Sequence, residues 1–263
     1  AFEVVRNLTM VLGFLIGGLL FQLGYWRQFF WIVGLGKLIL AICLKLQLNE
    51  PKRGAMHEEL SHVLGDESII YDYKINGKMM KETMLSKTNV VALIEGIFTC
   101  ILLGSLNFLI LNYIQNPPHN ISEFSTAIFM VIFGFTGGLI GQLVLARLSD
   151  KLATKNPIIR LPIIILAILG GIITFALFFW LPYPHLTVEQ GKNIFLMMSL
   201  PVIWMMGVLF FSSRAIFSLY IVNQAPLLQS INLPEAQAQI TSWNQFLENL
   251  GRGLGPLISG ILL

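Results

Sequence analysis

The chain has 263 residues, of which 55% are hydrophobic and 12% are charged, and its mean hydropathy is +0.73. A soluble domain of ordinary composition carries about 25% charged residues. The composition therefore excludes soluble enzymes and nucleic-acid-binding proteins, and it indicates an integral membrane protein. The net charge of +3 becomes informative only once the positions of the charges are known.

Apolar runs about 20 residues long, the length that a membrane-spanning helix needs, occur seven times along the chain. They are Leu8–Leu23, Phe29–Leu48, Val90–Ile114, Phe124–Ala146, Ile158–Leu181, Ile194–Val222 and Ile240–Leu263. Barrel strands would instead show short alternating segments. The predicted fold class is an all-α integral membrane bundle with seven transmembrane helices, in which Pro201 is expected to kink or tilt the sixth.

The two ends of the chain give a further expectation. The sequence begins Ala-Phe-Glu without an initiator Met, and it stops at Leu263 inside an apolar run. No signal peptide is recognisable at the start. We therefore expect the chain to be part of a longer protein.

Basic residues lie mostly on one side of the predicted membrane. The second-to-third and fourth-to-fifth connections carry Lys52, Arg53, Lys74, Lys78, Lys81, Lys87, Arg147, Lys151, Lys155 and Arg160, whereas the opposite side carries Arg27 and Lys192. Because basic loops stay inside, residues 50–89 and 147–160 are predicted to be cytoplasmic in a multi-pass protein of the cell membrane. Residues 50–89 are predicted to link a two-helix part, residues 1–49, to a five-helix part, residues 90–263.

The first and last predicted helices share a sequence pattern. Asn7-Leu8 and the run from Gly13 to Leu20 align without gaps on Asn249-Leu250 and the run from Gly255 to Leu262. Close helix packing through small residues explains such a pattern by itself. Repeats of membrane segments are also typical of transporters.

Four further motifs occur in a defined order along the chain. Ala146-Arg147-Leu148-Ser149-Asp150-Lys151-Leu152-Ala153-Thr154-Lys155 is similar to a Gly-x-Leu-x-Asp-Arg-x-Gly-Arg-Arg motif, with Ala146 and Ala153 replacing glycines and Thr154 replacing a basic residue. The others are Trp26-Arg27-x-x-Phe, Glu50-Pro51-Lys52-Arg53-Gly54, and Pro234-Glu235 followed by Asn249-x-Gly251-Arg252-x-x-Gly255-Pro256. With these motifs the chain resembles the major facilitator superfamily, whose twelve helices form two six-helix lobes.

The resemblance implies that the chain covers helices five to eleven, so that residues 1–49 end the N-terminal lobe and residues 90–263 form most of the C-terminal lobe. The Glu50-to-Ala55 run and the Pro234-to-Pro256 segment are most similar to the Spinster-like branch of lipid and organic-anion carriers. The implied function is secondary-active transport of a small organic or amphipathic solute by alternating access. The coupling ion, a proton or sodium, is left open.

The same resemblance implies a gating role for Asp150, flanked by Arg147 and Lys151. In this family the carboxylate holds the cytoplasmic start of helix eleven, here near residues 234–236, while the carrier faces outward. A carboxylate at a helix N-terminus gains about 0.3–1 kcal/mol. The alternative is a solvated loop charge.

Five charged residues fall inside predicted helices, where charges are costly and mark functional sites. They are Lys37, Glu95, Arg214, Glu248 and Arg252. Glu95 and Arg214 are predicted at matching depths, about 10 Å inside the inner boundary. The resemblance places them on helices seven and ten, facing the central cavity, with Asn107 on the same helix as Glu95.

Arg214 is predicted to anchor the anionic group of the substrate, with Glu95 as its partner when the site is empty and Phe217 on the same helix face. A structural ion pair is the alternative. Glu248 and Arg252 lie four residues apart and are predicted to form an intramembrane pair on one helix face. Lys37 is expected to snorkel at the outer rim.

Chemical motifs of other protein classes are missing from the sequence. Asp66, Asp72 and Asp150 lie in predicted loops, which excludes an intramembrane aspartyl protease. All four histidines also lie in predicted loops, so no Ser/His pair or His-ligated metal site is predicted in the membrane, and no phosphate-binding GxxxxGK[ST] loop occurs. The protein is therefore predicted to be a non-enzyme without cofactor or metal. A receptor, a scaffold or a pore stays open as the alternative to a carrier.

Overall fold

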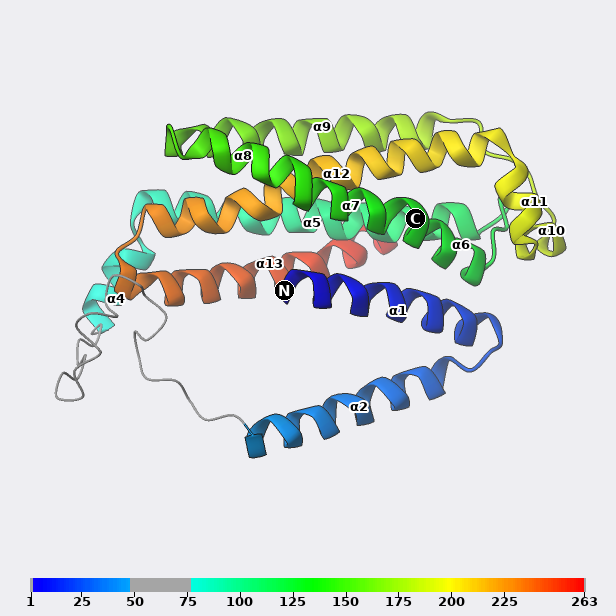
Figure 1. Ribbon diagram of the computed structural model, residues 1–263, viewed down its shortest axis with the longest axis horizontal. Helices are drawn as coiled ribbons and strands as arrows, with labels where there is room; N and C mark the ends of the chain where they lie inside the picture. The colour runs from blue at the N-terminus through cyan, green and yellow to red at the C-terminus, as the bar shows by residue number, and fades with distance from the viewer. Residues whose placement is uncertain (1, 48–76, 263) are drawn as a thin grey trace.

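The computed structural model describes residues 2–47 and 77–262, and all regular structure in these ranges is helical (Figure 1). Five helices in the described part are long and apolar enough to cross a membrane. They are α2 (Trp26–Gln47), α5 (Lys87–Gln115), the continuous helix Glu123–Ala153, the helix Pro157–Trp180 that contains α9 (Arg160–Trp180), and α12 (Pro201–Ser230). The fold is an all-α membrane bundle, as the composition predicts.

The first and last predicted spans each correspond to one helix. The first corresponds to α1 (Phe2–Gln22), whose apolar part among the described side chains is Val11–Gln22. The last helix, α13 (Pro234–Leu262), has full spanning length. Polar residues lower its hydropathy. Several of them, including Asn244 and Glu248, are buried inside the bundle.

The sixth predicted span differs from expectation at both ends. A short helix, α11 (Ile194–Ser199), stops before Leu200, which is extended with φ −82° and ψ 122°, and α12 then begins at Pro201. Proline suits the first turn of a helix and disfavours helical backbone in the residue before it, so Pro201 starts a helix instead of kinking one. The helix also continues to Ser230, well beyond the predicted end at Val222.

The helix Glu123–Ala153 contains two π-helical turns. It consists of α6 (Glu123–Phe129), a π turn at Met130–Phe135, α7 (Thr136–Ile140), a π turn at Gly141–Leu145 and α8 (Ala146–Ala153). The predicted fourth span thus continues through the motif that was expected to form a connecting turn. Asp150 consequently lies on the last turns of a helix.

The end of the predicted linker 50–89 is also helical. Residues 77–84 form α4 (Gly77–Met84), and α5 begins at Lys87, where Ser86 caps the helix by accepting a hydrogen bond from the Asn89 N–H. Linker residues 50–76 lie outside the described residues.

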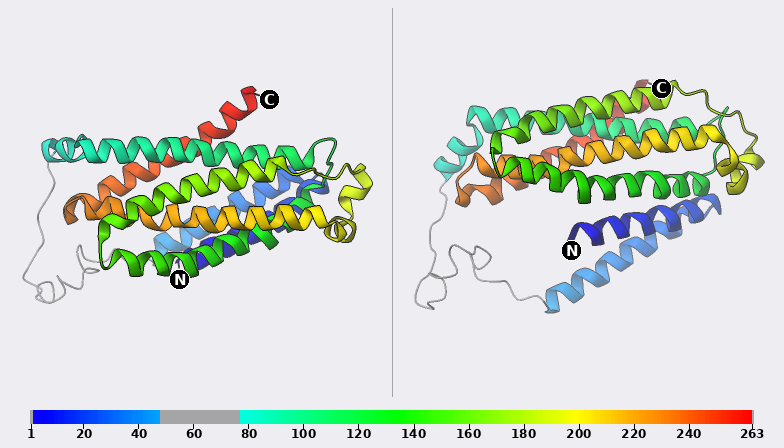
Figure 2. Two further views of the ribbon diagram at one scale, coloured as in Figure 1. Left: turned by 90° about the horizontal axis from the view of Figure 1, so that it is seen from above. Right: turned by 45° about the horizontal axis from the view of Figure 1, so that its top comes forward.

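Close helix packing depends on glycines. The most extensive helix pairs are α5 with α13 and α9 with α12, and the helix of α6 to α8 lies along α12 (Figure 2). A Cβ added at Gly104 of α5 would lie 2.6 Å from the backbone oxygen of Arg252 on α13, which is closer than real side chains come. Such small residues allow helix backbones to approach in a membrane.

The first two helices contact the rest of the described protein through α1. This helix packs on α6 and on the π turn that follows it, and a Cβ added at Gly18 would lie 2.7 Å from the Cβ of Ala127. After a turn at residues 23–25, α2 diverges from α1 (Figure 1) and buries no residue.

The bundle has two chemically different ends. We call the basic end the one where α5 and α9 begin and α8 ends; it carries Lys87, Arg147, Lys151, Lys155 and Arg160. Towards the other end, buried aromatic residues of α6, α9 and α12 form the largest apolar core, including Phe129, Phe178 and Phe210. Buried polar side chains occur at both ends, with Asn89 and Asn223 towards the basic end and Ser125 and Thr126 at the other.

Candidate functional site

Arg214 lies near the middle of α12 and reaches across to α5. Its Nη2 donates a hydrogen bond to Asn107 Oδ1 at 2.6 Å, and its Cζ lies 5.0 Å from the centre of the Phe210 ring. Among the described residues no carboxylate lies within salt-bridge distance of this guanidinium. Asn107 and Phe210 therefore orient the positive charge without neutralising it.

Glu95 has different neighbours, so the expected Glu95–Arg214 pair is wrong for this structure. Glu95 accepts a hydrogen bond of 2.6 Å from the Thr99 hydroxyl and one of 3.5 Å from the Tyr220 hydroxyl. About 24 Å of helix axis separate Arg214 from the end of α12, whereas about 12 Å separate Glu95 from the start of α5. The depths were predicted to match because α12 was expected to end at Val222.

A second polar group lies on α13, beside Glu95. The Glu248 carboxylate accepts hydrogen bonds from Asn244 Nδ2 at 2.7 Å and from Arg252 Nη2 at 3.1 Å. The Glu248–Arg252 pair that the four-residue spacing predicts is thus present, with Glu248 buried and Arg252 half-exposed. The backbone of Arg252 packs on Gly104, about one helical turn along α5 from Asn107.

Two of the predicted residues do not join these groups. Phe217 is 3% exposed, and its ring packs against Phe175 of α9, with 5.8 Å between the ring centres. It therefore belongs to the α9–α12 interface, and the aromatic neighbour of Arg214 is Phe210, one turn earlier. Lys37 is exposed on α2.

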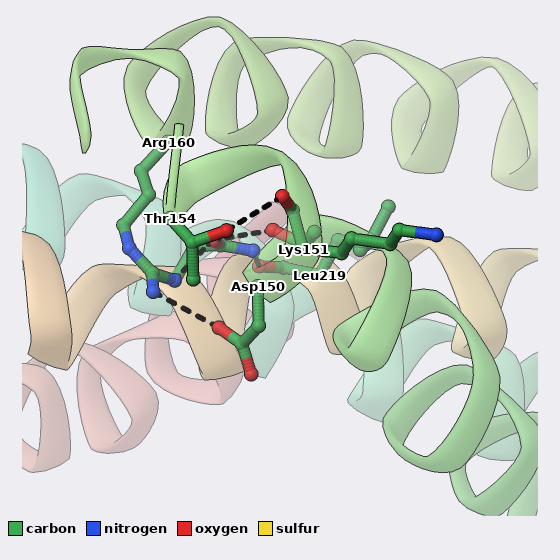
Figure 3. Close-up of polar contacts among 7 residues, drawn as sticks. Asp150, Lys151, Thr154, Arg160 and Leu219 are labelled. Carbon is green, nitrogen blue, oxygen red and sulfur yellow. Dashed lines mark hydrogen bonds and ion pairs between the residues drawn. The ribbon is translucent and has the colours of Figure 1, made fainter. Parts of the chain in front are cut away.

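At the basic end, Asp150 pairs with Arg160, the first residue of α9 (Figure 3). Arg160 Nη2 lies 2.9 Å from Asp150 Oδ1, and its Nη1 donates to Asn223 Oδ1 of α12 at 2.8 Å. The Ser149 hydroxyl donates to the same Asn223 oxygen at 2.6 Å. These four side chains connect α8, α9 and α12.

The other two residues of the predicted gate lie outside this cluster. Arg147 and Lys151 are exposed, and the side chain of Lys151 extends away from Asp150 (Figure 3). The side chains of Pro234 and Glu235, at the expected contact of Asp150, lie outside the described part.

Sequence reasoning missed several of the contacts. Thr99 lies four residues after Glu95 and Phe210 four before Arg214, so helical spacing offered a signal for both. Asn223 and Arg160 are brought to Asp150 by the fold, and no local pattern indicates their contact. Nowhere in the described ranges do three or more His, Cys, Asp or Glu side chains come close enough together to hold a metal ion.

Several apolar spanning helices with charged and amide groups packed between them define a multi-pass membrane protein. The sequence pattern of the Major Facilitator Superfamily matches residues 1–261, and the chain belongs to this superfamily. It is accordingly a membrane transport protein for a solute. No curated protein and no solved structure matches the chain, and the resemblance to the Spinster-like branch stays a prediction.

Proposed function

We propose that the protein is a secondary-active carrier of a small organic or amphipathic anion, and that Arg214 binds the anionic group. The supporting observation is the unneutralised guanidinium between α5 and α12. A charged group in the middle of a membrane costs about 2.5–3.5 kcal/mol on insertion scales, and Arg does not deprotonate in proteins. An anionic solute offers the missing counter-charge.

The surroundings of Arg214 suit this role. Asn107 occupies one N–H group of the guanidinium, which leaves other N–H groups for a carboxylate, sulfate or phosphate. The Phe210 ring packs on the guanidinium and limits its rotation. We assign Asn107 and Phe210 to positioning Arg214.

The proposed mechanism is alternating access in the cell membrane, driven by a proton or sodium gradient and without an enzymatic step. Residues 50–89 and 147–160 are assigned to the cytoplasmic side from their basic residues. In this arrangement the Asp150–Arg160 pair lies at the cytoplasmic end of α8 and α9. We propose that it stabilises one of the two conformations of the carrier.

The test uses the purified full-length protein in liposomes and a panel of octyl amphiphiles: octyl phosphate, octyl sulfate, octanoate and neutral octyl glucoside. We expect protein-dependent, saturable uptake of at least one anionic member and no protein-dependent uptake of octyl glucoside, each relative to liposomes without protein. Protein-dependent uptake that rises linearly with concentration would indicate a pore, and binding of no anion would contradict the proposed anion site.

Arg214→Lys tests the residue itself. It keeps the positive charge but removes the planar group that forms paired hydrogen bonds. We expect affinity for the transported anion to fall about tenfold, which corresponds to about 1.4 kcal/mol, with thermal stability retained. Arg252→Lys is the matched control, since Arg252 is paired with Glu248. Unchanged affinity in Arg214→Lys would refute the assignment.

A further inference from the structure

Glu95 is a carboxyl inside a membrane-spanning helix with hydroxyl neighbours and no basic partner. Its two oxygens accept hydrogen bonds from Thr99, one turn along α5, and from Tyr220 of α12. In the described part of the chain no Lys, Arg or His lies within salt-bridge distance of Glu95. A structural ion pair would need such a cation, as Glu248 has in Arg252.

Three helices meet beside this carboxyl. A Cβ added at Gly96 would lie 3.1 Å from Asn244 Oδ1 of α13, 3.2 Å from Gln224 Nε2 of α12 and 3.6 Å from Glu248 Cγ. The side chain of Glu248 thus reaches the residue next to Glu95 on α5. Glu95 therefore lies where α5, α12 and α13 meet.

The charged and titratable groups around this region can be named for the described part of the chain. On α5 itself they are Lys87 at its start, the buried Cys100, and Tyr113 near its end. From the neighbouring helices come Tyr220 and Arg214 of α12 and Glu248 and Arg252 of α13. Near the two ends of α5 lie Lys78, Lys81 and Glu82 of α4 and Glu123 of α6. Because Arg252 already pairs with Glu248, it is not free to neutralise Glu95.

We propose that Glu95 is the carboxyl that binds and releases the coupling proton during transport. Uptake of one proton converts the carboxylate to a neutral acid without another reactant, and release to water on the other side restores the negative charge. A metal cation fits less well, since hard cations take about six oxygen ligands and Glu95 has two hydroxyl groups beside it. This inference rests on the proposed secondary-active transport.

The first experiment needs no solute. Infrared difference spectra of the purified full-length protein in nanodiscs, between mildly acidic and mildly alkaline buffer, report the C=O stretch of protonated carboxyl groups. We expect a band that Glu95→Gln removes and that persists in Glu123→Gln, an exposed control. A band retained in Glu95→Gln would overturn the proposal even if the anion site at Arg214 is correct.

Thr99→Val is the second variant, for the case in which Glu95→Gln fails to fold. It removes one hydrogen-bond donor and keeps the side-chain shape. The Thr99 hydroxyl stabilises the ionised form of Glu95, so we expect the pH at which the band is half-formed to rise, whereas a band from another carboxyl group would not move. An unchanged titration in folded Thr99→Val would overturn the proposal.

The second experiment measures coupling with the transported octyl anion as probe. In liposomes, Glu95→Gln is expected to abolish the stimulation of net uptake by a pH gradient while exchange of labelled for unlabelled anion continues. Arg214→Lys is expected to weaken both. Uptake that still responds to the pH gradient in Glu95→Gln, or that responds to a sodium gradient instead, would overturn the assignment of the proton to Glu95.

Discussion

Single polar residues hold the helices of this protein together at defined points. Glu248 and Arg252 are adjacent on one helix face, so their contact follows from sequence spacing and could be predicted. The partners of Arg214 and Asp150 depend on where α12 ends and on how α9 folds back, and the sequence does not show either. Local pairs are therefore predictable in this site, whereas pairs between helices required the structure.

Asn223 provides a test at this scale. Its side chain is fully buried, and its oxygen accepts hydrogen bonds from Ser149 and Arg160. Asn223→Leu leaves both donors without this acceptor, so we expect a loss of about 1–3 kcal/mol in the free energy of unfolding, measured by thermal denaturation in detergent. Asn116→Leu at the exposed end of α5 is the control. Equal melting temperatures for the two variants would contradict this role.

The helices themselves follow from apolar runs, but their ends do not. Hydropathy locates the spans, because unbroken apolar stretches of this length must be helical in a membrane. It does not show that α11 and α12 are separated before Pro201. Nor does it show that α12 continues beyond Val222 through residues 223–230, which include several polar residues. In α13 some polar residues, such as Asn244 and Glu248, are buried against the neighbouring helices, whereas others, such as Gln245, are exposed.

The α5–α13 pair yields the prediction at the scale of elements. Gly104→Ala places a methyl group against the backbone of Arg252, so one of the two helices must move. We expect a destabilisation of about 1–3 kcal/mol, measured by thermal denaturation. Gly138→Ala is the matched control, since a Cβ there meets nothing within 4 Å. Similar melting temperatures for the two variants would show that the α5–α13 contact tolerates a methyl group.

At the scale of the whole molecule, specific contacts join helices from different parts of the chain in addition to the extensive α5–α13 and α9–α12 packing. Gly18 and Ala127 bring α1 against α6, and Asp150, Arg160 and Asn223 join α8, α9 and α12 at the basic end. The division into residues 1–49, 50–89 and 90–263 stays a prediction. A transport cycle would have to preserve some of these contacts and break others.

Asp150→Asn tests the contact at the basic end. It removes the charge that pairs with Arg160, so we expect the ratio of the two carrier conformations to change by up to about fivefold, as the roughly 0.2–1 kcal/mol of an exposed ion pair implies. The ratio is measured by double electron–electron resonance, from the distances between spin labels at Leu46 and Leu152 of the full-length protein. Lys155→Gln is the control at an exposed site.

A double variant separates this contact from an unspecific effect of charge. If Asp150 acts through Arg160, Asp150→Asn combined with Arg160→Gln should change the ratio no more than either substitution alone. Additive changes, or an unchanged ratio in Asp150→Asn, would indicate that Asp150 is a solvated charge without a role in this equilibrium.

The two π turns between Glu123 and Ala153 change the direction in which this helix presents its side chains. Each π turn contains one residue more than an α-helical turn, which rotates the following segment by about 100°. The half that contacts α1 and the half that lies along α12 are thereby brought out of phase with each other. The Thr136 hydroxyl donates to the backbone oxygens of Ile132 and Phe133 in the first π turn. The Thr136 hydroxyl thus supports a shift in helical register that lets a single spanning helix pack against α1 with one half and against α12 with the other.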